Sequence, residues 1–465
     1  MIVKQIFTYV FSVGDEQTLW TMRPDLILLL LQLNQKENLQ IIDEKNVVQN
    51  FAEKFALQYI NNNDDDLRLH TLRLLIESKM NKKDEFNQIE LNLIYRLFKN
   101  CDTIQRAYGR DQLIKLFRIL FTRIARAITT QHKRNKTEFV GNNQIYYDFI
   151  QMICRYCFDN LHINRYFGSL LIYLQILHLL VDKLLVSTKP LLIMLQDSCI
   201  TPVDRQSLMF MLQHSLQEIR TAAKDFIVSC YHLKLIAFTQ NEINFLNKWS
   251  KTMLQSIQPR ESQIGVILKQ LTVSLDDNNG YSSHFDVIQT LIIELNQRIA
   301  VINVNITNSC TSPCYPLLLA IRTLLCNEID LNKLKSDLQN DEQKLSSWKI
   351  LFIQMIDSCM AACESIISIV CNDSPEGHLP AVENLENINF DFHDDHISEL
   401  YMISQMLLIN GWMTIKESVL IISHLVNSFP YHRSANETII SCVYIDKIID
   451  FLYKNQLNLV HRGAF

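Results

Sequence analysis

The chain has 465 residues and a formal net charge of −5, so it is not a globally basic nucleic-acid binder. Hydrophobic residues make up 48% and charged residues 20%, which excludes wholesale disorder. Only 9 Gly and 9 Pro are present, well below the usual frequencies of about 7% and 5%. Strand-rich folds and α/β enzymes need glycine at turns and phosphate loops, so this composition favours helix after helix.

Amphipathic stretches alternate with short polar breaks along the chain, and four of the stretches share a pattern. Each has a polar or acidic cap and a basic residue, followed by small and apolar residues. The basic residues are Arg68, Arg110, Arg165 and Arg220. Spacings of roughly 40 to 55 residues fit a repeated helix pair. Any capped amphipathic helix shows part of this pattern, but four in succession favour an all-α fold, a HEAT/armadillo-like α-solenoid of stacked helix pairs.

The polar breaks suggest how the solenoid is divided. We expect HEAT-like helical repeats over 1–300 and a continuation of the solenoid over 301–465. The longest break is an acidic insertion near 371–398, which is either a projecting binding segment or a plain disordered loop. The longest apolar run, 168–186, contains Gln, His, Asp and Lys, so we interpret it as a buried helix and expect no membrane span.

One predicted helix is strongly basic. Between Cys101 and Lys136 there are nine Lys and Arg residues against two Asp. At 100° per residue, four of the cations share an arc of about 140° opposite an apolar face, and two more follow in the adjoining polar segment. These six are Lys115, Arg118, Arg123, Arg126, Lys133 and Arg134. On an acidic protein such a stripe is a candidate RNA or phosphate contact, although solvated helix faces are often charged.

Patterns that would carry catalysis or bind a metal are weak. Cys154 and Cys157 form a CxxC, but a structural zinc site needs four ligands and no second pair follows at zinc-finger spacing. The twelve Cys lack a regular framework and indicate reduced thiols. We find no Walker loop, GxGxxG, GxSxG or HExxH. We therefore expect a non-enzyme with no catalytic, cofactor-binding or metal-ligating residues.

Three C-terminal motifs resemble those of the THADA family. The segment 373–380, DSPEGHLP, is similar to the family's SPEG-x-(hydrophobic)-P element, and 412–417, WMTIKE, resembles its C-W-R-x-x-K-E helix. The terminal HRGAF, 461–465, matches its K/R-H-R-G-A-F segment. Within these motifs the positions we single out are Pro375, Glu376, Gly377, Trp412, Lys416, Glu417, His461, Arg462 and Gly463. Met413 stands where the family usually has Arg, which puts any contact of that Arg in doubt.

The resemblance implies a cytoplasmic, non-catalytic scaffold whose C-terminal part begins the family's DUF2428-type region. It implies a regulatory role in tRNA processing: supporting 2′-O-ribose methylation of tRNA at anticodon-loop nucleotide 32. The partners would be tRNA and an FtsJ-type methyltransferase, which itself would bind S-adenosylmethionine. Because family members are several times longer, we expect this chain to be a fragment. The alternative is a general HEAT-repeat scaffold with a non-RNA client.

Roles for single motif residues follow from their chemistry. Trp412 is expected to pack in the core. Lys416 and Glu417 are expected to begin the polar face of their helix, either as a structural ion pair or as an intermolecular contact. Arg462 is a further candidate for contact with the RNA backbone.

Overall fold

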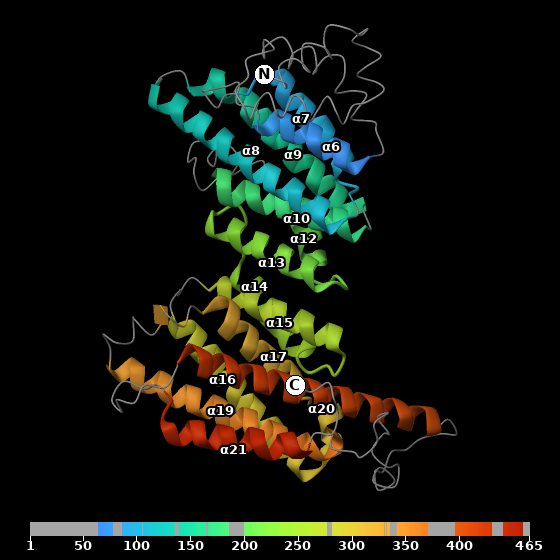
Figure 1. The fold of residues 1–465 in the computed structure, drawn as a ribbon, viewed down its shortest axis with the longest axis vertical. Helices are drawn as coiled ribbons and strands as arrows, with labels where there is room; N and C mark the ends of the chain where they lie inside the picture. Colours follow the sequence, from blue (N-terminus) through green and yellow to red (C-terminus); the bar gives the residue numbers. More distant parts are fainter. Residues whose placement is uncertain are drawn as a thin grey trace, which may run out of the picture. The chain divides into compact units, whose positions relative to one another are not determined.

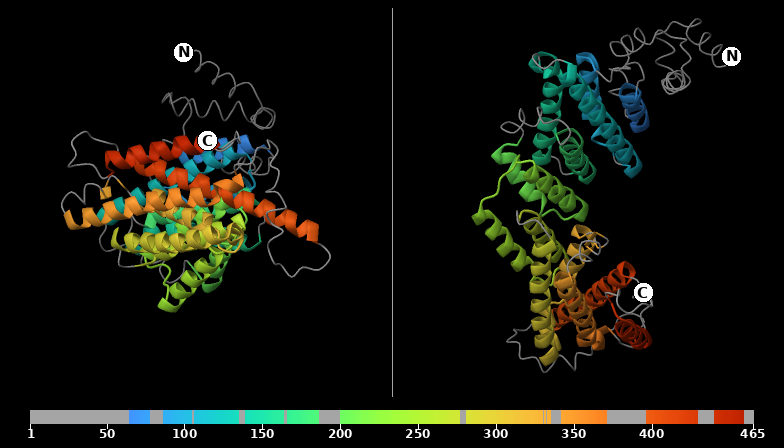
Figure 2. Two further views of the ribbon diagram at one scale, coloured as in Figure 1. Left: turned by 90° about the horizontal axis from the view of Figure 1, so that it is seen from below. Right: turned by 90° about the vertical axis from the view of Figure 1, so that its left-hand side faces the viewer.

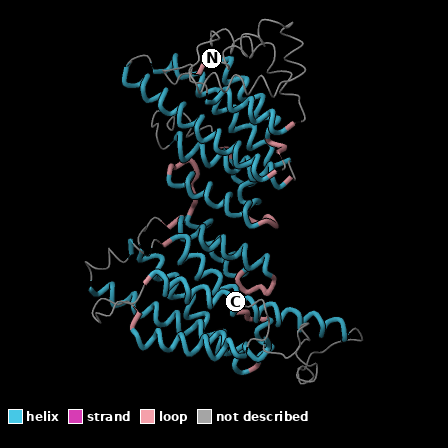
Figure 3. The backbone as a smooth tube through the Cα atoms, in the orientation of Figure 1, coloured by secondary structure: helices cyan, strands magenta, loops and turns pink. Residues whose placement is uncertain are grey.

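The computed structural model describes residues 64–77, 86–104, 106–134, 139–163, 166–185, 200–276, 281–329, 331, 333–334, 342–370, 396–429 and 440–458. Within these ranges all regular secondary structure is helical, as Figure 3 shows. The expected all-α solenoid of helix pairs is therefore confirmed. The chain forms two compact units, residues 1–237 and 238–465, which are described separately below.

The first unit contains successive helices that each pack against near neighbours (Figure 1). Helix α6 packs against α7 and α8, while α10 packs against α8, α9 and α13. The elements are α6 (Asp65–Glu77), α7 (Gln88–Cys101), α8 (Ala107–Arg134), α9 (Phe139–Ile163), α10 (Phe167–Leu179), the π-helical η1 (Leu180–Leu185), α12 (Pro202–Met211) and α13 (Gln217–His232). The apolar run near 168–186 forms α10 and η1, and most of α10 is buried as expected.

The second unit continues the same all-helical build (Figure 2). Helix α19 packs against α16 and α20, α17 packs against α15 and α20, and α14 packs against α15. The elements are α14 (Gln240–Met253), α15 (Pro259–Ser274), α16 (Tyr281–Val304), the 3₁₀ turn η2 (Ile306–Cys310), α17 (Tyr315–Thr323), the π-helical η3 (Leu324–Glu328), α19 (Glu342–Val370), α20 (His396–Ser428) and α21 (Cys442–Asn458).

Local sequence explains where several helices begin. The side chains of Asn87, Thr201 and Thr239 each accept a hydrogen bond from the backbone N–H three residues on. In return, the backbone N–H of each cap residue donates to the acidic side chain at that position. These reciprocal capping boxes satisfy amides that a helix start leaves free. The three starts are therefore encoded in the sequence itself.

Buried and half-buried arginines bind carbonyls near helix ends in both units. Arg68 donates to the Asn100 carbonyl in the last turn of α7. Arg220, which is fully buried, donates to the carbonyls of His214 and Ser215 at 2.6 and 2.9 Å. In the second unit Arg298 donates to the Leu254 carbonyl at the end of α14, at 3.1 Å. Carbonyls at and beyond a helix C-terminus lack intrahelical donors. Arg68 and Arg220 of the repeat pattern, and Arg298 outside it, supply such donors.

Helices α14 and α15 approach each other closely at Gly265. A Cβ atom added at Gly265 would lie 2.9 Å from the Leu254 backbone nitrogen. The Ser250 hydroxyl donates to the Gly265 carbonyl at 2.7 Å. Because only glycine leaves this space free, the two helices meet almost backbone to backbone at this point.

Among the described residues, three helical segments of the second unit are long and apolar enough to cross a membrane by length and composition alone. They are His284–Val304, Gln343–Ser368 and Gln405–Ser428. Between 39% and 56% of their most apolar windows is buried inside the unit. A large part of their apolar surface is therefore used for helix packing, including the contacts of Trp348 and Phe352 in the core.

Candidate nucleic-acid interface

Helix α8 is anchored by one apolar face. Leu116, Phe117, Leu120, Phe121 and Ile124 are all at most 2% exposed. Their spacing of three and four residues places them on one side of the helix. The Phe117 ring also contacts Phe98 of α7, with ring centroids 4.9 Å apart. The opposite face is thereby held outward, where the basic residues were expected.

Three of the expected cations share that outer face. Lys115, Arg118 and Arg126 are exposed, and none forms an ion pair within the part of the chain that the structure describes. The exposed carboxylate of Asp111 lies on the same side, one turn before Lys115. Three cations against one acid leave a net positive strip, the charge that a phosphate backbone requires.

Arg123 lies apart from the other three. It is half-buried, donates a hydrogen bond to the Ile76 carbonyl at the end of α6, and stacks over the Phe86 ring at 4.2 Å. Its guanidinium is therefore engaged in joining α8 to neighbouring segments. Sequence periodicity places Arg123 in the basic stripe because it gives the angular position of a residue on the helix and carries no information about contacts with neighbouring helices.

Several other residues that we predict to contact RNA, or that belong to the family motifs, lie outside what the structure describes. Lys133 and Arg134 form the last residues of α8, but their side chains lie outside what the structure describes. Arg462, with His461 and Gly463, lies outside the described residues, as do Pro375, Glu376 and Gly377 with most of the acidic insertion. These positions remain predictions.

The structure describes every residue of the motif at 412–417 on α20. Trp412 is half-buried and packs against the core of the second unit, in line with its expected packing role. Lys416 is exposed, as expected for a polar face. Glu417 is buried, with 4% of its side chain exposed, and forms an ion pair with Arg322 of α17. Glu417 therefore takes part in a structural ion pair, one of the two expected alternatives. The expectation that it shares the polar face of Lys416 is wrong, because one helical step carries it into the α17–α20 contact.

The sequence analysis missed a polar network buried in the first unit. Asp102 follows α7 and accepts hydrogen bonds from the hydroxyls of Tyr156 and Tyr173, the latter at 2.6 Å. The Ser169 hydroxyl donates to the Asp102 carbonyl at 2.7 Å. Burial raises the pKa of Asp102, opposed by these two tyrosine hydrogen bonds. The network joins the end of α7 to α9 and α10, and nothing in the sequence spacing marks it.

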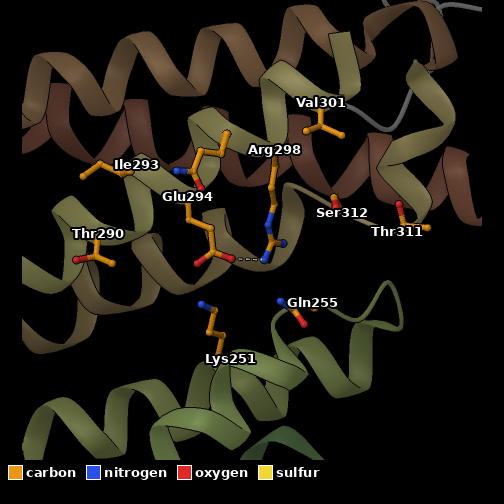
Figure 4. Close-up of a pocket in the computed structure, with 10 residues that line it drawn as sticks. Lys251, Gln255, Thr290, Ile293, Glu294, Arg298, Val301, Thr311 and Ser312 are labelled. Carbon is orange, nitrogen blue, oxygen red and sulfur yellow. Dashed lines mark hydrogen bonds and ion pairs between the residues drawn. The ribbon is translucent and has the colours of Figure 1, made fainter. Parts of the chain in front are cut away.

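A pocket of about 710 Å³ lies between α14 and α16 (Figure 4). Lys251 lines it from α14 and Gln255 from the turn after that helix, while Glu294 and Arg298 line it from α16. Arg298 is paired with Glu294 at 2.6 Å, so these two charges offset one another. Lys251 is exposed and forms no ion pair among the described residues, which leaves the pocket mouth positive. The sequence analysis did not identify this site.

Most cysteines within the described residues are buried. Burial raises the pKa of Cys101 and Cys314 to about 12 each, and raises that of Cys157 well above its ordinary value. A buried thiol with a raised pKa is a poor nucleophile. Among the described residues, no group of three or more His, Cys, Asp or Glu side chains is placed to hold a metal ion.

The fold and the basic face together define a helical-repeat protein with a locally positive surface, and two family models specify the class. One, described as "Trm732, TPR repeats", matches residues 2–192, and another, described as "THADA/TRM732, DUF2428", matches 351–465. The chain belongs to the THADA/Trm732 family. The description of the first model names TPR repeats, and the described helices from α6 to η1 fall within the range that it matches.

A curated relative carries a functional name. The chain is 24% identical over 169 residues to the tRNA (32-2'-O)-methyltransferase regulator THADA of Drosophila melanogaster. The match covers 33% of this chain and 9% of that relative. No solved structure matches the chain.

Proposed function

We propose that the protein is a non-catalytic regulatory subunit for tRNA ribose methylation. In this proposal it supports 2′-O-methylation at anticodon-loop nucleotide 32 by an FtsJ-type methyltransferase in the cytoplasm. The methyltransferase binds S-adenosylmethionine, while this chain contributes to holding the tRNA. The name of the Drosophila relative supports the reaction class.

The observation that carries the RNA-holding role is the outer face of α8. Lys115, Arg118 and Arg126 are exposed without ion-pair partners among the described residues, on a chain whose net charge is −5. Each cation placed against a phosphate displaces a condensed counterion, so binding is favoured and depends strongly on salt. Phosphate contacts of this kind position an RNA without reading its sequence.

Co-purification tests the proposal against a scaffold with a non-RNA client. The full-length protein is purified from cells with and without ribonuclease treatment, and bound proteins and tRNA are identified. We expect an FtsJ-type methyltransferase and tRNA to be recovered together, with tRNA recovery lost when the α8 cations are reversed. Recovery of unrelated proteins alone, unchanged by ribonuclease, would contradict the proposal.

A further inference from the structure

The outer face of α14 exposes an aromatic side chain to solvent. Phe245 is 64% exposed, and its ring lies 6.2 Å from that of the half-buried Trp249, with 39° between the planes. The side chains that hold the helix in place are on its other side, where Leu246 and Ser250 are buried. A ring this exposed presents a flat apolar face to solvent. Such rings serve as stacking surfaces for unpaired bases.

Positive charge accompanies this ring, and α14 itself carries a single acid. Lys248 and Lys251 are exposed and form no ion pair among the described residues. The single acid of α14, Glu242, is held in the capping box with Thr239. The outward arc of the helix therefore combines an aromatic ring with two cations, the combination typical of surfaces that follow a single-stranded backbone.

The pocket described above adjoins this face, because Lys251 belongs to both (Figure 4). Ile293 and Val301 line it with apolar side chains that are 54% and 45% exposed. Gln255 and Gln297 add amide groups that can both donate and accept hydrogen bonds. Its volume lies within the ~300–1,000 Å³ range of ligand pockets. The apolar side chains can contact the face of a heterocyclic base, the amides can hydrogen-bond to its edge, and Lys251 can contact a phosphate attached to it.

We propose that the outer face of α14 and the adjoining pocket bind single-stranded RNA. Lys248 and Lys251 contact backbone phosphates, a base stacks on Phe245, and a further base enters the pocket between α14 and α16. A duplex offers its backbone but keeps its base faces stacked, so the exposed ring selects unpaired nucleotides. The inference rests on the proposed function for its ligand class, but it uses a surface that lies between the two family-matched regions.

Fluorescence anisotropy with the 465-residue chain tests this site directly. The probes are a labelled, unstructured oligouridine and an RNA duplex of equal length. We expect Phe245→Ala to weaken oligouridine binding roughly 5- to 150-fold, the range expected from loss of one stacked base, and to leave duplex binding unchanged. We expect Lys248→Ala with Lys251→Ala to reduce the salt slope for the oligouridine by about 1.4.

The helix α21 offers a matched control. Tyr453 is 66% exposed and Lys454 is exposed beside it, but the same helix also exposes Asp446 and Asp450. Tyr453→Ala with Lys454→Ala should leave oligouridine binding unchanged. Phe245→Leu, which keeps an apolar side chain without an aromatic face, should behave like Phe245→Ala, and circular dichroism verifies that every variant is folded.

The outcomes separate this inference from the proposed function. Oligouridine binding that is the same in the parent and all α14 variants would overturn the α14 site, whatever the α8 variants do. Loss of methyltransferase binding in Phe245→Ala with unchanged RNA binding would also overturn it, by making the face a protein-docking surface. Weakened oligouridine binding in the α14 variants, with tRNA absent from the purified complex, would support the site while contradicting the proposed function.

Discussion

Glu417 of α20 forms a buried ion pair with Arg322 of α17, although 95 residues separate them in the chain. The Glu417 side chain is 4% exposed and that of Arg322 is 29% exposed. Two helices of the second unit are thus joined by a pair of opposite charges. The motif that carries Glu417 is accordingly a structural element in this position.

Removing the charge of Glu417 tests this relationship. We expect Glu417→Gln to lower the free energy of unfolding by about 1–3 kcal/mol, because Arg322 loses its charged partner but can still reach water. Urea denaturation of the 465-residue chain measures the loss. Glu364→Gln, at an exposed position on α19, is the control and should change stability by less than about 0.5 kcal/mol. Equal effects of the two substitutions would contradict the structural role.

The α14–α15 contact at Gly265 makes a second prediction. A Cβ atom there would meet the Leu254 backbone nitrogen at 2.9 Å and the Met253 Cβ at 3.0 Å, and neither can move independently of α14. We expect Gly265→Ala to lower the free energy of unfolding by about 1–3 kcal/mol.

Gly168 provides the matched control, because a Cβ there meets first the flexible end of Arg110, with Nη1 at 3.2 Å. We expect Gly168→Ala to be neutral or slightly stabilising, since alanine has the higher helix propensity. Denaturation midpoints of the two variants in the same buffer give the comparison. A Gly265→Ala protein as stable as the parent would show that α14 and α15 do not pack this closely.

The buried Asp102 predicts a pH dependence. Its pKa is raised by burial, so the folded state binds the proton more readily than the unfolded state does. Its contribution to stability therefore falls as the pH rises from about 4 through the raised pKa. We expect the stability of Asp102→Asn relative to the parent to increase between pH 4 and pH 7. Urea denaturation of both proteins across this range measures the difference, and a difference that is constant or decreases with pH would contradict the account.

The outer face of α8 predicts a salt-dependent tRNA affinity. We expect Lys115→Glu, Arg118→Glu and Arg126→Glu together to weaken tRNA binding and to reduce the salt slope by about 2–3. Filter binding at several salt concentrations measures both quantities. Lys234→Glu, Lys344→Glu and Lys454→Glu, three exposed positions elsewhere, make the same change in net charge and should leave the slope unchanged. A similar loss from both triple variants would indicate non-specific electrostatics.

The sequence predicts the helical content and one face of α8 well, because both depend on local periodicity. Leu116 and Lys115 were assigned to opposite faces from spacing alone, and the structure confirms this. Arg123 and Glu417 were misplaced, since their partners lie at Ile76 and Arg322, 47 and 95 residues away. Helix angle cannot distinguish a cation facing water from one held by another helix.

The arginine in the repeat pattern shows the same limit in another form. The sequence shows that this arginine recurs, as at Arg68 and Arg220, but it does not show which groups the arginine binds. The carbonyls that it binds lie at the ends of helices, at Asn100 and in the turn at His214. The pocket between α14 and α16 was missed for a related reason, because its lining from Lys251 to Ser312 comes together only when the two helices pack.

Ribose methylation at tRNA nucleotide 32 tests the central claim most directly. Mass spectrometry quantifies the 2′-O-methyl group in cells depleted of the full-length protein and then supplied with it, either unchanged or with the three α8 cations reversed to glutamate. The account predicts that methylation is lost on depletion, restored by the unchanged protein and by the control triple variant, and not restored by the α8 variant. Methylation that persists after depletion, or full restoration by the α8 variant, would contradict it.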